Sequence, residues 1–114
     1  MKRLLTFGGA ACAILLTASW AGAQTTANPG MDVFVAQKCT QCHAIGARGN
    51  KKGALDDVGS RLTAAQIREW LTNPEGMAAK RTPKSTRKPP MKKKPLKAAD
   101  LDALVTMLSE LKKQ

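Results

Sequence analysis

The sequence has few aromatic residues and a single histidine. Aromatic side chains make up 4% of the 114 residues and tyrosine is absent, so the usual aromatic filling of a small core is thin. One histidine, His43, excludes sites that need two imidazoles, such as a three-histidine zinc centre or an HExxH metalloprotease. Three cysteines are too few for a scaffold held together by disulfides. This length supports one globular domain.

Acidic residues are also scarce. Asp and Glu number 8 against 19 Lys and Arg, which gives a formal charge of +11. A balance this basic indicates anionic partners, although it does not say of which kind.

The N-terminal residues have the pattern of an export signal. Lys2 and Arg3 precede an uncharged, mostly apolar stretch, Leu4 to Ala23, which ends in Ala21-Gly22-Ala23. A basic start, an apolar stretch and small residues at the end are typical of a secretory signal peptide. We predict that residues 1–23 are cleaved and that residues 24–114 form the exported, periplasmic domain. The alternative is an uncleaved membrane anchor, because the stretch is about 20 residues long, enough to span a bilayer.

Three segments have the pattern of helices, and none has the pattern of a strand. Apolar spacing predicts a short helix from Met31 into the region of Cys39. Thr63 and Gln66 form a capping box that opens a second helix, which Asn73-Pro74 should end. A third helix should carry an apolar stripe and end with Lys112 and Lys113 in its last turn; the stripe comprises Leu101, Leu104, Val105, Leu108 and Leu111.

Two segments lack such periodicity. Residues 44–59 contain four glycines and are expected to form a loop. Residues 76–97 contain four prolines, which we take to exclude a helix there. The part from Lys80 to Lys97, called the basic segment below, has no acid and nine cations: Lys80, Arg81, Lys84, Arg87, Lys88, Lys92, Lys93, Lys94 and Lys97.

The most specific motif is Cys39-Thr40-Gln41-Cys42-His43, the C-x-x-C-H signature of c-type haem attachment. Two thiols at this spacing add to the two vinyl groups of the porphyrin, and the adjacent histidine becomes the proximal iron ligand. A thioredoxin-type dithiol is not indicated, because it requires a βαβ context and none is present. A structural zinc site is not indicated either, because it requires four ligands and residues 24–114 offer only two cysteines and one histidine. A Cys39–Cys42 disulfide would leave His43 unexplained. A haem would also supply the apolar core that the chain lacks.

With this motif in place, the chain from Gly30 to Lys113 resembles the class I monohaem cytochromes c. Gly30 and Phe34 lie where that family's first helix meets its last, and the haem motif follows. The resemblance implies an all-α cytochrome c fold, roughly three or four short helices around one haem c bound through Cys39 and Cys42. It also implies that Trp70 and Arg61 lie near the haem propionates.

The resemblance further implies a methionine as the second axial ligand. Met91, in Lys88-Pro89-Pro90-Met91, lies shortly before the last helix, where the family keeps this ligand. We therefore predict that His43 and Met91 bind the iron. Met77 is an alternative second ligand, and a lysine or an open site is another. The other two methionines of residues 24–114 are not expected to bind the iron, because Met107 should lie in the core and Met31 lies too near the proximal side. The family's proximal loop normally has a proline whose carbonyl accepts the histidine Nδ1–H. Here Gly53-Ala54-Leu55 occupies that place, and the carbonyl of Ala54 is expected to serve.

These features predict a periplasmic electron-transfer protein rather than an enzyme. Its expected partners are acidic redox proteins, which the basic segment would attract. An anionic membrane surface is a further candidate, whereas nucleic acid is not expected, because the chain is exported and its basic run lacks interleaved aromatics. Two alternatives remain: a cytochrome c subunit of a larger periplasmic oxidoreductase complex, and a haem-based ligand-binding or sensor protein with an open distal site.

Overall fold

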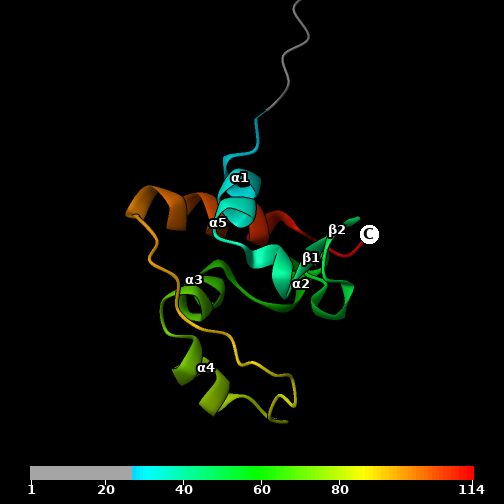
Figure 1. Ribbon diagram of the computed structural model, residues 1–114, viewed down its shortest axis with the longest axis vertical. Coiled ribbons are helices and arrows are strands. Elements are labelled where there is room, and N and C mark those ends of the chain that lie inside the picture. The colour runs from blue at the N-terminus through cyan, green and yellow to red at the C-terminus, as the bar shows by residue number, and fades with distance from the viewer. Residues whose placement is uncertain (1–26) are drawn as a thin grey trace, which may run out of the picture.

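The computed structural model describes residues 27–114, so the predicted signal peptide lies outside the described residues. That part of the chain contains five helices, two single 3-10 turns and one small hairpin. The arrangement of the helices and strands is shown in Figure 1. The helices are α1 (Pro29–Ala36), α2 (Val58–Arg61), α3 (Ala64–Thr72), α4 (Pro74–Lys80) and α5 (Ala98–Glu110). The 3-10 turns are η1 (Cys39–Gln41) and η2 (Lys51–Gly53), and the strands are β1 (Ala44–Ile45) and β2 (Arg48–Gly49). The predicted all-α class is confirmed, and the described helices include none long and apolar enough to cross a bilayer.

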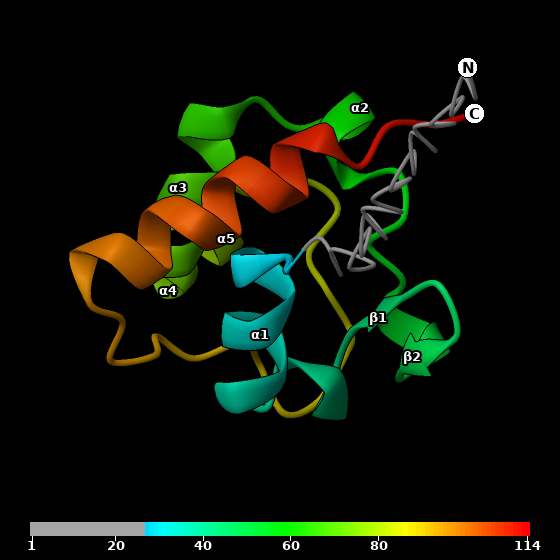
Figure 2. The same ribbon diagram turned by 90° about the horizontal axis from the view of Figure 1, so that it is seen from above.

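The C-terminal helix α5 is the centre of the fold. Helices α1, α2 and α3 all pack against it, and Figure 2 shows α1 and α3 beside it. Phe34 and Leu104 are the most deeply buried large side chains, 2% and 1% exposed. The rest of the core is Val58, Ile67, Val105, Met107 and Leu108. The expected places of Phe34 and Met107 in the core are therefore confirmed.

A glycine lets α1 approach α5 closely. A Cβ on Gly30 would lie 2.5 Å from the Cβ of Met107 and 2.6 Å from the backbone oxygen of Ala103. The backbone oxygen cannot move without bending α5, so the crossing requires a residue without a side chain at position 30.

The first helix begins earlier and ends earlier than predicted. The Asn28 side chain caps it by accepting a hydrogen bond from the Met31 N–H, and Pro29 suits the first turn, which needs no N–H donor. The helix ends at Ala36, because Lys38 adopts a left-handed conformation with φ of 57°. It therefore stops before Cys39 rather than running into it.

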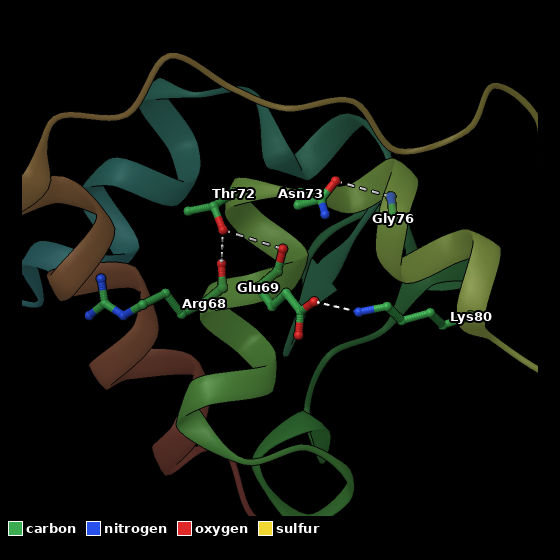
Figure 3. Close-up of polar contacts among 6 residues, drawn as sticks. All are labelled: Arg68, Glu69, Thr72, Asn73, Gly76 and Lys80. Atoms are coloured by element: carbon green, nitrogen blue, oxygen red, sulfur yellow. Dashed lines mark hydrogen bonds and ion pairs between the residues drawn. The ribbon is translucent and has the colours of Figure 1, made fainter.

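The corner after α3 corrects another prediction. The capping box of Thr63 and Gln66 is confirmed, and α3 ends at Thr72 as Asn73-Pro74 predicted. Asn73 also begins a new helix, since its side-chain oxygen accepts the Gly76 N–H at 3.1 Å and Pro74 occupies the first turn (Figure 3). The prediction that residues 76–97 contain no helix is thus wrong as far as Lys80. It failed because the four prolines of that stretch all lie beyond position 82.

Two smaller expectations also fail. Residues 44–59 contain a hairpin that pairs Ala44 with Gly49 and Ile45 with Arg48, in strands too short to show a period. Lys112 and Lys113 lie beyond the end of α5 at Glu110 rather than in its last turn. There the Lys112 ammonium donates to the Gly59 carbonyl at 2.6 Å and fastens the C-terminal residues to α2.

Candidate haem site

The C-x-x-C-H motif folds into one tight turn. The left-handed residue Lys38 redirects the chain out of α1 and into η1. The N–H groups of Cys42 and His43 then both donate to the Cys39 carbonyl, at 3.1 and 2.9 Å. Cys39 is half-buried, Cys42 is exposed, and both thiols are free. This arrangement, called the attachment turn below, gathers two thiols and one imidazole within five residues.

The neighbouring loop fixes the His43 imidazole. Its Nδ1 lies 3.0 Å from the Gly53 carbonyl oxygen. Because a carbonyl can only accept, Nδ1 carries the proton and Nε2 is left as the ring nitrogen with a free lone pair. The acceptor is the carbonyl of Gly53 and not that of Ala54 as expected. Ala54 instead pairs with Ala44 in an isolated bridge.

Gly53 is required here by crowding. A Cβ at this position would overlap the Cys42 carbonyl oxygen and would lie 3.0 Å from His43 Nδ1. The loop can approach the imidazole closely enough to bond it only because the residue has no side chain.

The surroundings of His43 favour its neutral form. Burial lowers the pKa of the imidazole, the Arg87 cation lowers it further, and the hydrogen bond to Gly53 opposes both. A neutral imidazole is the form that binds a metal.

Asn50 closes the attachment turn from the hairpin side. Its N–H lies 3.0 Å from the Thr40 carbonyl and 3.1 Å from the His43 carbonyl, and its side-chain amide donates to the Gln41 carbonyl at 3.2 Å. Sequence reasoning missed this residue, although an asparagine beside Gly49 is typical of a turn that needs side-chain bonding to the backbone.

The basic segment contacts the attachment turn through Arg87. The Arg87 guanidinium donates to the Cys42 carbonyl through Nη2 at 3.0 Å. Burial raises the pKa of the Cys39 thiol, and the Lys94 cation is close enough to lower it in part. Met91 lies between these two residues in the sequence.

The four methionines within residues 27–114 have different surroundings. Met107 lies in the core and is 5% exposed, and Met31 is partly buried and packs against the core cluster. Met77 is half-buried on α4, whereas Met91 is 36% exposed and belongs to no described core cluster. Met91 is thus the methionine least engaged in protein packing.

Trp70 and Arg61, the two residues expected near the haem propionates, differ in how far they are buried. Trp70 is half-buried on α3. Arg61 forms an exposed ion pair with Asp57 at 3.0 Å, and its hydrogen bonds among the described residues do not reach the attachment turn.

The residues at the turn fit a haem c. Two unpaired thiols lie one turn apart, and His43 offers Nε2 while Nδ1 is held. Nearby apolar side chains, Ile45 and Leu55 among them, pack against the core but stay partly exposed, as the border of an apolar ring requires.

Fold and site together define a small all-α protein built around a haem-attachment turn. Residues 27–112 match the sequence model of the family described as Cytochrome c, and comparison with curated proteins and solved structures gives no match. The chain belongs to the cytochrome c family. It is therefore a haem c electron-transfer protein in the general sense of that family, which carries its haem covalently.

Proposed function

We propose that the protein is an exported, periplasmic electron carrier with one haem attached through Cys39 and Cys42 and ligated by His43 and Met91. When bound, this group supplies one-electron exchange between Fe(III) and Fe(II), and no substrate is transformed. The observation that carries the ligand assignment is the course of the basic segment. Arg87 bonds the Cys42 carbonyl and lies four residues before Met91, so the segment that contains Met91 is held at the attachment turn.

The residues around the two ligands would hold each in place. The Gly53 carbonyl fixes the ring orientation of His43 and makes Nε2 a stronger donor. Pro89 and Pro90 precede Met91 and restrict the backbone that presents its thioether. Because a thioether is a soft ligand, this pair favours a comparatively high reduction potential.

The basic segment also supports a docking role. Three of its cations are engaged: Lys80 pairs with Glu69 at 3.0 Å (Figure 3), Lys84 donates to the Ala79 carbonyl, and Arg87 bonds Cys42. Within the part of the chain that the structure describes, Lys88, Lys92, Lys93 and Lys94 form no salt bridge. They surround Met91 in sequence, in a segment that contacts the attachment turn through Arg87. We infer that this surface receives an acidic redox protein at the haem edge.

The attachment is tested on the exported protein by extraction and mass. With two thioether bonds, acid-acetone leaves the haem on the chain, and the mass equals residues 24–114 plus one haem. Free haem in the extract contradicts covalent attachment, and a mass that includes residues 1–23 contradicts cleavage.

The carrier role is tested by spectra and purification. A six-coordinate, low-spin spectrum in both oxidation states is expected of a carrier, whereas an open distal position would indicate a ligand-binding protein. Purification as a free monomer supports the carrier, and co-purification with another protein at fixed stoichiometry supports a subunit of a larger complex.

A further inference from the structure

Arg87 makes a contact that neither haem attachment nor partner docking explains. Its side chain reaches across 45 residues of sequence to the Cys42 carbonyl, at 3.0 Å from Nη2. Cys42 directly precedes the proximal ligand, and Arg87 lies four residues before the proposed distal ligand. One side chain thus joins the backbone beside both proposed iron ligands.

The loop on the far side of the turn is shaped to admit this guanidinium. A Cβ on Gly53 would overlap Nη1 of Arg87 as well as the Cys42 carbonyl. The guanidinium therefore lies against Gly53, whose own carbonyl holds His43 Nδ1. Because Gly53 has no side chain, the Arg87 guanidinium can lie against it and its carbonyl can approach His43 Nδ1.

Few other contacts fix this part of the chain. From residue 82 to residue 95, the remaining described hydrogen bonds are local: Lys84 to Ala79, the Arg87 N–H to Ser85, and Leu96 to Lys94. Among the described residues, Arg87 is the one member of this stretch whose side chain bonds the attachment turn.

We propose that Arg87 is a positioning residue that fastens the basic segment to the attachment turn and so keeps Met91 within reach of the iron. The inference rests on the proposed function. A guanidinium suits this role because its planar fork can bond a carbonyl while lying flat against a glycine. Its charge beside His43 also disfavours the ferric state, although solvent screens it because the side chain is exposed.

The test compares three variants of the exported haem protein: Arg87→Gln, Arg87→Lys and Arg81→Gln. Arg81 is the matched control, since it belongs to the same segment, is exposed and has no described side-chain hydrogen bond. Imidazole binds the ferric iron only after Met91 has left, so its affinity reports how firmly Met91 is held. In Arg87→Gln we expect this affinity to rise about three- to tenfold, the effect of losing one hydrogen bond of ordinary net strength, because Arg87 is exposed to solvent. Arg81→Gln should match the wild type, and Arg87→Lys should fall between them.

Two further readouts separate fastening from ligation. The ferric-to-ferrous ratio at a fixed applied potential should rise in Arg87→Gln more than in Arg81→Gln, because the lost charge lies nearer the iron. Trypsin should cut the basic segment faster in Arg87→Gln than in Arg81→Gln, each of which lacks one cleavage site.

Equal imidazole affinity and equal cleavage in the two glutamine variants overturn the inference. A wild-type spectrum without methionine ligation instead overturns the ligand assignment in the proposed function. In that case the trypsin comparison still decides whether Arg87 fastens the segment.

Discussion

The attachment turn and the basic segment are built in opposite ways. Backbone hydrogen bonds hold the turn from several sides: Cys42 and His43 bond Cys39, and Asn50 bonds both Thr40 and His43. The basic segment contains almost no backbone bonds between Pro83 and Pro95, and residues 83–95 are exposed. One half of the site is thus fixed by the chain itself, whereas the other half depends on a few long side chains.

This difference follows from composition. The attachment turn, Cys39 to His43, contains no proline, so each of its residues has a backbone N–H that can donate a hydrogen bond. The basic segment combines four prolines, which lack donors, with cations that repel one another. A haem bound at the turn and ligated by Met91 would supply the missing constraint. We therefore predict that substitutions in the attachment turn prevent the folded haem protein from accumulating. Substitutions in the basic segment should instead leave the protein folded and change its electron-transfer rate.

The largest effect is expected from the attachment turn. Cys39→Ser or Cys42→Ser removes one thioether, and little folded haem protein should accumulate, because cofactor binding and folding are coupled in so small a core. The measurement is the yield of exported protein with covalent haem. Thr40→Ser, inside the same motif, is the control and should retain normal yield. Normal yield of the cysteine variants would contradict the coupling.

A large effect is also expected where α1 meets α5. Phe34→Ala should lower the free energy of unfolding of the haem protein by about 3–5 kcal/mol, because it leaves a cavity in the core. Val35→Ala is the matched control: Val35 is 43% exposed, so its truncation should cost about 0.5 kcal/mol or less. Denaturant titration measures both. Equal losses at the two positions would mean that the α1–α5 contact is not the core.

The effect at the α3 capping box is smaller. Thr63→Ala removes the side-chain oxygen that accepts the Gln66 N–H at 3.2 Å, and should cost about 1 kcal/mol of unfolding free energy. Thr106→Ala, at an exposed position within α5, should be neutral or slightly stabilising, since alanine favours helix. Denaturant titration measures the free energy of unfolding of both variants. An unchanged free energy of unfolding in Thr63→Ala would mean that packing against α5, and not the capping box, holds α3 in place.

The basic segment should give the smallest effect on stability and a clear effect on rate. Replacing Lys92, Lys93 and Lys94 by glutamine should leave the unfolding free energy unchanged, because these cations are exposed. Electron transfer to an acidic partner should slow at low salt, toward the unsteered association rate of about 10⁵–10⁶ M⁻¹s⁻¹. The difference should fade as the Debye length falls from about 30 Å at 0.01 M to about 8 Å at 0.15 M salt.

The control for this experiment carries the same charge change elsewhere. Arg48, Lys51 and Lys52 are exposed cations on the hairpin and η2, and their replacement by glutamine should slow the reaction less. Equal slowing would assign the effect to net charge, and a rate independent of salt in the wild type would contradict electrostatic docking.

Local sequence signals predicted the fold better than they predicted its contacts. The apolar stripe around Leu104 and the Thr63 capping box depend on residues near one another in sequence, and both predictions are confirmed. The role of Gly30 was predicted only through family resemblance, since a close approach between distant helices leaves no periodic signal. The α4 helix was missed because Pro74 both ends one helix and begins another.

The site was predictable only as far as the motif itself. Cys39, Cys42 and His43 follow from a five-residue pattern, and the structure brings them into one turn. The Gly53 acceptor and the Arg87 contact join residues 10 and 45 positions apart, and no local pattern encodes such pairs. The assignment of Met91 stays a prediction, which rests on its place in the chain and on the Arg87 contact at the attachment turn.

The most direct test of the account is the ferric absorption spectrum of the haem protein in the wild type, Met91→Ala and Met77→Ala. Methionine ligation to low-spin ferric haem gives a weak band near the red edge of the visible spectrum. We predict that this band is present in the wild type and Met77→Ala and absent in Met91→Ala, whose potential also falls and whose iron binds added imidazole. Loss of the band in Met77→Ala and its survival in Met91→Ala would contradict the central claim that the basic segment supplies the second iron ligand.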